Sequence, residues 1–291
     1  MSKLFSDRYR DDSEFSTAPN LYLLTIASSG SGKSTGIDFV NEAVLHMKFE
    51  NKLSELRNGE QFMANITSRV AFCLEFERNR TASLQRDEAS EFLGSTTGNG
   101  RNPCNVDLVA FLKENFTMHK NPEYLIYRSK ESEITLRNPS PTVLFYTTNG
   151  MIQQNVDISM IEGGLMGRFL IFKGWGSDEN RRQLDDAKNK GGLPSRVKKW
   201  IGDVDRSLFD SMLDDDGVLR GSSNQDLKLA SQLDDEPEIL CRSDEVVREF
   251  NACLDVWDKW KVDAPILQEA MWARAAEKVS KLAILFACSR A

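Results

Sequence analysis

One short segment combines small residues, a lysine and hydroxyl side chains in an order suited to binding phosphate. Residues 27–35 read ASSGSGKST. Glycine lets the backbone curl so that successive N–H groups point at phosphate oxygens, and a helix that begins here adds the positive end of its dipole. We interpret residues 27–35 as a Walker A loop in which Ala27 stands at the first glycine position.

The side chains of this loop predict its ligand. Lys33 should reach the β- and γ-phosphates of ATP, and the Ser34 hydroxyl should bind Mg²⁺. The remaining contacts are expected from backbone and hydroxyl groups of Ser28, Ser29, Gly30, Ser31, Gly32 and Thr35. A chance turn before a helix is the alternative interpretation.

Hydrolysis also needs an acid for the metal and a base for water. Asp87 and Glu88 follow a short run, residues 82–86, that reads as a strand. At a strand end, Asp87 would lie in the outer shell of Mg²⁺ and Glu88 near the attacking water. The run is polar for a buried strand, so a solvated helix start is the alternative, with Asp38 and Asp107 as the alternative acids.

Two further polar residues lie next to apolar runs. Asn149 follows the run at residues 143–146 and is predicted to orient water beside the γ-phosphate; the alternative is a turn that caps the strand. Arg168 lies among small residues before the apolar run at residues 169–172. A guanidinium in such surroundings needs a carboxylate or phosphate partner. We therefore expect either an arginine finger for a neighbouring subunit's ATP or a structural ion pair.

The elements that would position these groups are read from the alternation of apolar runs and helical patterns. Residues 21–26 predict a buried strand and residues 33–49 a helix, which is the context that the loop requires. A β-hairpin is expected around residues 129–132. It would carry basic residues that could contact DNA phosphates, namely Arg128, Lys130 and Arg137.

The chain divides into four predicted regions. Residues 1–19 are a polar tail or linker, and residues 20–175 have the pattern of an α/β ATPase core, with a central, mostly parallel sheet flanked by helices. Residues 176–238 are a polar excursion and an acidic connector. Residues 239–291 form a C-terminal helical segment without a helix stop signal, so we expect it to continue in a longer protein.

Two helices are expected in that last region, each with one apolar face. The face of the first is predicted to carry Val246, Val247, Phe250, Leu254 and Trp257. The face of the second, which opens at Pro265, is predicted to carry Met271, Ala275, Val279, Leu282, Leu285 and Phe286.

Composition excludes several classes of protein. The five cysteines and two histidines are scattered, which favours a reducing compartment over a disulfide framework or a zinc site. No signal-peptide pattern is visible, and the longest apolar stretch, residues 282–288, is too short for a bilayer. A net charge of −7 argues against a uniformly basic surface but permits a local basic channel. We expect a cytoplasmic protein with no membrane partner.

Taken in order, the motifs resemble a known group of motors. The segments ASSGSGKST, DEASEFL, TVLFYTTN, GGLMGRFLIF and RAAEKVSKLAILFACSR are similar to the helicase/ATPase half of phage and mobile-element primase–helicase proteins, and to the wider superfamily III and AAA+ motors. The likeness covers residues 20–175 and 266–290. It implies a P-loop NTPase core that forms a ring, with a hexamer expected, and that translocates on single-stranded DNA.

The resemblance carries over onto Lys33, Ser34, Asp87, Glu88, Asn149 and Arg168. Arg274 would be a second sensor of the nucleotide, with a surface role as the alternative. The resemblance also implies a primase or loader as a further partner, although no primase active-site pattern is present. The chain departs from the family at Ala27 and in the polar run before Asp87.

Two other functions stay open. A nucleotide or small-molecule kinase uses the same loop but needs several arginines in a lid, and Arg181-Arg182 is the only adjacent pair. A nucleotide-binding switch without hydrolysis would be favoured if Asp87 and Glu88 lay far from the loop.

Overall fold

A computed structural model describes most of the chain. The described residues are 9–12, 17–29, 33–48, 62–63, 66–79, 82–97, 101–117, 124–128, 133–137, 139–174, 193–210, 238–262, 264–265, 268–269 and 272–288. Within them, the side chains of residues 9–11, 33–35, 124–128, 133–135, 137, 208–210, 238–239 and 261 are not part of the described structure.

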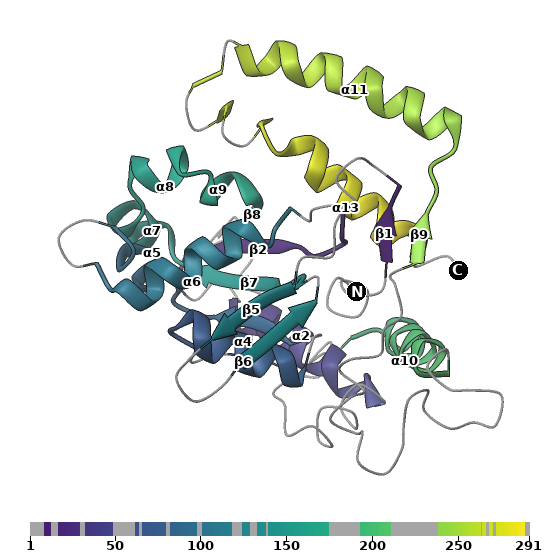
Figure 1. Ribbon diagram of the computed structural model, residues 1–291, viewed down its shortest axis with the longest axis horizontal. Coiled ribbons are helices and arrows are strands. Elements are labelled where there is room, and N and C mark those ends of the chain that lie inside the picture. The colour runs from purple at the N-terminus through teal and green to yellow at the C-terminus, as the bar shows by residue number, and fades with distance from the viewer. Residues whose placement is uncertain are drawn as a thin grey trace, which may run out of the picture.

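The centre of the molecule is a sheet of five parallel strands. Their order across the sheet is β3 (Phe62–Met63), β4 (Ser83–Arg86), β7 (Thr142–Thr147), β2 (Tyr22–Ile26) and β8 (Phe169–Lys173). Parallel strands need crossover connections, and here helices supply them on both faces. The predicted α/β class with a parallel sheet flanked by helices is confirmed (Figure 1).

Alternate residues of β2 enter two separate cores, as the period of a strand requires. Tyr22 and Leu24 are fully buried on one face, and Leu23 packs on the other. The first face is covered by α4 (Arg69–Arg78), α5 (Ala89–Gly94), α6 (Pro103–Glu114), α7 (Asn149–Asn155), α8 (Ile158–Glu162) and α9 (Leu165–Arg168). The second face is covered by α2 (Lys33–Leu45), α10 (Ser195–Asp210) and α13 (Ala275–Cys288).

The strand order makes the connections diverge beside β2. The chain leaves β2 through α2 and crosses the second face to β3, whereas it leaves β7 through α7, α8 and α9 and crosses the first face to β8. Two neighbouring parallel strands whose exits go to opposite faces leave a crevice at their carboxyl ends. In sheets of this kind, ligands bind at that crevice.

Two small sheets flank the main one. The predicted hairpin is present: β5 (Tyr124–Arg128) pairs antiparallel with β6 (Glu133–Arg137), and β6 packs against α4. A second pair, β1 (Tyr9–Asp11) and β9 (Glu238–Leu240), is parallel and joins the region expected as a tail to the end of the region expected as a connector. The Arg242 guanidinium donates to Asp12 beside this pair, at 2.6 Å.

The C-terminal helices differ in how much they bury. Figure 1 shows α11 (Asp244–Val262) standing apart from the sheet, above α13. Val247, Phe250, Leu254 and Trp257 are its half-buried residues, at the predicted helical spacing, and Val246 is exposed. Among the described helices, none has the length and apolar content that a membrane span needs.

The predicted apolar face of the last helix is wrong in part. Val279 and Phe286 are exposed, and two lysines, Lys278 and Lys281, are buried in their place. The lysines are tolerated because their amino groups find backbone and side-chain oxygens at the edge of the sheet. Hydrophobic spacing alone could not identify these acceptors.

Candidate phosphate-binding site

The segment between β2 and α2 begins at the crevice that the strand order creates. The Ala27 N–H donates to the Thr147 carbonyl of β7 at 3.1 Å, and the Gly174 N–H donates to the Ile26 carbonyl at 2.8 Å. The start of the loop is therefore held between the ends of β7 and β8. Ser28 and Ser29 follow and are exposed, and the chain is helical again from Lys33.

The strand–loop–helix context is thus present, although part of the predicted loop lies outside the described residues. Gly30, Ser31 and Gly32 belong to that part, and the side chains of residues 33–35 do as well. What the structure describes is the backbone frame. A short loop joins the carboxyl end of a central strand to the first turn of a helix of 13 residues, the arrangement in which helix N–H groups can receive an anion.

Gly174, which follows β8, lies close to the start of the loop. A Cβ added at Gly174 would lie 3.0 Å from the Cβ of Ala27. Neither atom belongs to a flexible side chain, so a larger residue at either position would displace the loop. Sequence reasoning missed Gly174 because its neighbour across the sheet depends on the strand order.

Asp87 and Glu88 lie at the same edge of the sheet as the loop. The register aligns Arg86 with Phe145 and Phe145 with Leu24, so the two acids follow β4 level with the last residues of β7 and β2. Neighbouring strands are about 4.8 Å apart, which puts β4 about 10 Å from β2. Both acids are exposed.

Asp87 affects the pKa of Tyr146 on the neighbouring strand β7. Burial is the main cause that raises the pKa of the Tyr146 hydroxyl, and the negative charge of Asp87 adds to it. The chain turns from β4 into α5 at these acids, with Glu88 at the helix N-cap position but without a side-chain cap. The two interpretations of this segment are therefore compatible, because the acids follow a strand and also precede a helix.

The polar character of β4 has a structural cause. The Arg86 guanidinium lies 4.4 Å from the Phe92 ring centre and donates to the Ile66 carbonyl. Its burial lowers the pKa of Arg86. The strand thus ends in an arginine that is held by an aromatic ring and a carbonyl, and Ser83 at its start is fully buried.

The two alternative acids do not share this position. Asp107 lies on α6 and forms an ion pair with Arg69 at 3.4 Å. This ion pair explains Asp107 without a role at the loop. Asp38 lies on α2, one turn past its first residues, and is exposed. Asp87 and Glu88 remain the acids that directly follow a strand of the main sheet.

Asn149 also lies at the carboxyl edge. It is the first residue of α7 and is exposed, and the cap of that helix is Thr148, whose hydroxyl oxygen accepts from the Met151 N–H at 3.4 Å. Within the described residues the Asn149 side chain makes no hydrogen bond. The Thr147 carbonyl, two residues before Asn149, accepts from the Ala27 N–H, so Asn149 is two residues from a direct contact with the loop.

Lys173 is a further cation at this edge that sequence reasoning missed. The register pairs it with Ile26, the residue before the loop, and its side chain is exposed. The sequence signal was present, because Lys173 ends an apolar strand. Its proximity to the loop became visible only when β8 was found to pair directly with β2.

Arg168 lies at the opposite edge of the sheet. Phe169 pairs with Tyr22, so Arg168 is level with Leu21, about 20 Å from Ala27 at about 3.3 Å per residue. Its guanidinium donates to the Gly164 carbonyl at 2.6 Å and lies 6.0 Å from the Phe116 ring centre. Burial, and next the charge of Arg274, lower its pKa. Arg168 cannot reach the loop of its own chain.

Three cations from α13 and the residue before it accompany Arg168 at this edge, namely Arg274, Lys278 and Lys281. Arg274 donates to Thr117 at 3.2 Å and to the carboxylate of Glu277 at 3.1 Å. Lys278 donates to the Phe169 carbonyl at 3.4 Å, and burial lowers its pKa. Lys281 is fully buried and donates to Ala18, Asn20 and Phe116, at 3.0, 2.5 and 2.7 Å. Among these described residues, Glu277 pairs with Arg274 at 3.1 Å and lies 4.0 Å from the Lys281 amino group.

Of the three residues predicted to contact DNA, the structure describes the backbone of Arg128 and Arg137. Arg128 ends β5 opposite Glu133, and Arg137 ends β6 opposite Tyr124. Lys130 lies outside the described residues. Because β6 packs on α4 and Leu136 enters the first core, the base of the hairpin belongs to the outer helical layer.

Neither a metal site nor a comparison with known proteins identifies the site further. Among the described residues, no three histidine, cysteine or acidic side chains converge in a way that could hold a metal ion. Comparisons with family models, with curated proteins and with solved structures return no match. The comparisons therefore show no family. The structure shows an α/β fold whose main sheet has five parallel strands.

Proposed function

We propose that this protein is an ATP-hydrolysing motor with a P-loop core, which binds Mg-ATP on residues 27–35. The observation that carries the proposal is that the loop, the Asp87-Glu88 pair and Asn149 all lie at one edge of the sheet. Three separate segments of the chain bring a candidate phosphate loop, a carboxylate pair and an amide to the crevice at the strand ends.

The proposed reaction uses these groups in distinct roles. Lys33 and the loop amides bind the phosphates, and Ser34 holds Mg²⁺ with Asp87 in its outer shell. Glu88 accepts hydrogen bonds from the attacking water, which Asn149 orients toward the γ-phosphorus. Lys173 lies on the far side of the loop from the acids, where a positive charge favours bound phosphate.

The position of Arg168 is the reason to propose an oligomer. Its distance of about 20 Å from the loop of its own chain means that it can act only on a nucleotide held by a neighbour. An arginine supplied in this way offsets the negative charge that develops on the transferred phosphoryl group. A head-to-tail arrangement that uses such a contact at every interface closes into a ring, and we propose a hexamer.

We propose that the motor translocates on single-stranded DNA. Residues 128–137, with Arg128, Lys130 and Arg137, are the basic hairpin that would contact DNA phosphates without reading sequence. A primase or loader is a compatible partner. The DNA part of the proposal rests on the sequence resemblance and on the presence of the hairpin.

A steady-state assay tests the proposal. We expect Mg²⁺-dependent phosphate release from ATP that rises when unlabelled single-stranded DNA is added, and we expect Lys33→Ala to abolish it. Lys259→Ala, on the exposed side of α11, is the matched control and should keep the full rate. Full DNA-stimulated turnover in Lys33→Ala would refute the site. Turnover that needs a small-molecule phosphate acceptor instead of DNA would identify a kinase.

A further inference from the structure

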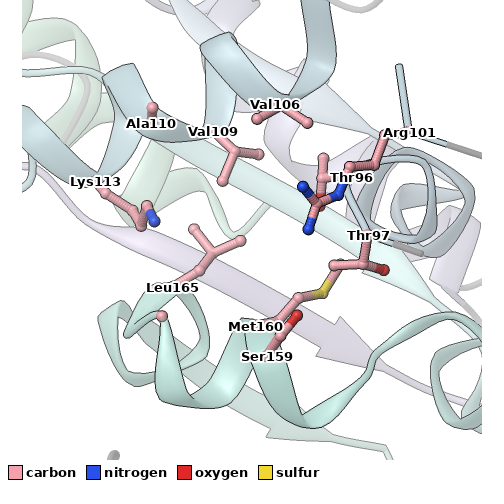
Figure 2. Close-up of a pocket in the computed structure, with 11 residues that line it drawn as sticks. Thr96, Thr97, Arg101, Val106, Val109, Ala110, Lys113, Ser159, Met160 and Leu165 are labelled. Atoms are coloured by element: carbon pink, nitrogen blue, oxygen red, sulfur yellow. The ribbon is translucent and has the colours of Figure 1, made fainter. Parts of the chain in front are cut away.

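A cavity lies in the outer helical layer, away from the candidate nucleotide site. It encloses about 160 Å³ between α6 on one side and α8 and α9 on the other. Figure 2 shows its apolar wall, which consists of Val106, Val109, Ala110, Met160 and Leu165. None of the residues that line it belongs to residues 27–35 or to the acid pair.

Two cations flank this apolar wall. In Figure 2, Arg101 and Lys113 lie on opposite sides of the cavity, one before the first turn of α6 and the other in its last turn. Neither side chain has a hydrogen bond or an ion pair with any residue that the structure describes. No aspartate or glutamate is among the lining residues, although the chain as a whole has a net charge of −7.

Asp157 contacts two residues that line the cavity, Ser159 and Thr97, and is held by hydrogen bonds at the start of α8. Asp157 accepts from the Ser159 hydroxyl at 2.6 Å and from the Met160 N–H at 3.2 Å. The hydroxyl of Ser159, and to a lesser degree that of Thr97, help to lower the pKa of Asp157. Asp157 is therefore the acceptor at the start of α8, and the two charged residues that line the cavity itself, Arg101 and Lys113, are both positive.

We propose that this cavity binds a small organic dianion, of the class of short-chain dicarboxylates. The aliphatic chain packs on Val109, Met160 and Leu165, and the two acid groups pair with Arg101 and Lys113. Charged hydrogen bonds to two separated cations select a ligand with an acid at each end. Pockets for drug-sized ligands are about 300–1,000 Å³, so a cavity of 160 Å³ selects a much smaller molecule.

The proposal is independent of nucleotide hydrolysis, because it rests on residues of α6, α8 and α9 and the turns beside them. An occupant would nevertheless contact the segment that leads to Arg168, since Leu165 opens the four-residue helix α9 that Arg168 ends.

Methyl NMR on the full chain tests the proposal with hexanedioate as the probe. With ¹³C-methyl methionine, the Met160 signal should shift and saturate with a dissociation constant on the order of 1 mM, as expected for a ligand of about ten heavy atoms. The Met47 methyl, in the core on the other face of the sheet, should not move. Hexanoate, which has one acid group, should bind about tenfold more weakly.

Two further probes separate the parts of the ligand. Hexanamide has the chain without the charge, and inorganic phosphate has the charge without the chain; neither should move Met160 at the same concentration. Equal affinity for hexanamide, or a phosphate response as strong as that of hexanedioate, would overturn the proposal.

Substitutions at the two cations provide the second arm of the test. Arg101→Ala and Lys113→Ala should each weaken hexanedioate binding about tenfold, the value of one charged hydrogen bond. Arg248→Ala and Lys259→Ala, both exposed on α11, are the matched controls and should bind like the unmodified chain. Unchanged binding in both Arg101→Ala and Lys113→Ala contradicts the assignment.

Discussion

Replacing Arg168 with alanine tests whether the active site is completed by a neighbouring subunit. The guanidinium is about 20 Å along the sheet from the loop of its own chain, too far for one side chain to span. An arginine that acts on a neighbour's nucleotide is worth about 10³–10⁵ in kcat, or about 4–7 kcal/mol at 1.36 kcal/mol per tenfold. We therefore expect Arg168→Ala to bind ATP normally and to lose at least about 10³-fold in turnover.

Mixing two inactive variants separates this role from a structural one. Arg168→Ala subunits keep the loop, and Lys33→Ala subunits keep the arginine. In mixed rings a site works when an Arg168→Ala subunit lies next to a Lys33→Ala neighbour. An equal mixture should recover about one quarter of the wild-type rate if the sites act independently.

Two outcomes would exclude a role for Arg168 at a neighbour's nucleotide. If Arg168→Ala alone keeps its turnover, or if the mixture forms rings of normal size and stays inactive, Arg168 is not a finger. Its contacts with Gly164 and Phe116 would then be its whole contribution. Arg248→Ala on α11 is the matched control and should leave both the rate and the ring unchanged.

Three other predictions follow from named contacts. Glu88→Gln should lower kcat about 10²–10⁴-fold with ATP binding retained. Glu91→Gln, exposed on α5, should leave kcat unchanged. Equal rates for Glu88→Gln and the wild type would contradict the role of Glu88 as the base for water. Lys281→Met leaves three buried oxygens without their donor, so it should lower the free energy of unfolding by about 3–5 kcal/mol. The control Lys259→Met should lower it by about 0.5 kcal/mol. Similar urea midpoints for the two variants would refute the buried network. Burial raises the pKa of Cys73 to about 12, so the native chain at pH 8 should react with iodoacetamide at the exposed Cys104, Cys241 and Cys253 and not at Cys73; rapid native-state labelling of Cys73 would show that this core is open.

Local sequence patterns predicted the elements that depend on near neighbours. Apolar runs identified β2 and β7, the spacing of Phe250, Leu254 and Trp257 identified the half-buried side of α11, and turn residues identified the hairpin. In each case the signal lies within about a dozen residues, where periodicity directly reflects which side chains face a core.

Other features depended on contacts between distant segments. The position of β8 beside β2, which brings Lys173 and Gly174 to the loop, follows from packing across the whole sheet. The pairing of β1 with β9 joins segments more than 200 residues apart, and the helix α10 lies inside a region that sequence reasoning described as an excursion and connector. No local pattern encodes such partners.

Buried charges were the main source of error. Lys278 and Lys281 replaced Val279 and Phe286 on the inner face of α13 because specific oxygens were available to the amino groups. Arg86 similarly makes β4 polar without exposing it, since Phe92 and the Ile66 carbonyl receive the guanidinium. A hydrophobicity pattern treats such residues as solvent-facing, and only the three-dimensional arrangement reveals their acceptors.

We propose that the loop at residues 27–35 and the acids at 87–88 form one site. A crystal structure of the chain with Mg²⁺ and a slowly hydrolysed ATP analogue would show whether they do. We predict phosphates on the loop amides, Mg²⁺ beside Ser34, and an Asp87 oxygen about 4 Å from the metal through a bound water. An analogue bound elsewhere, or a metal about 10 Å or more from both carboxylates, would contradict the account.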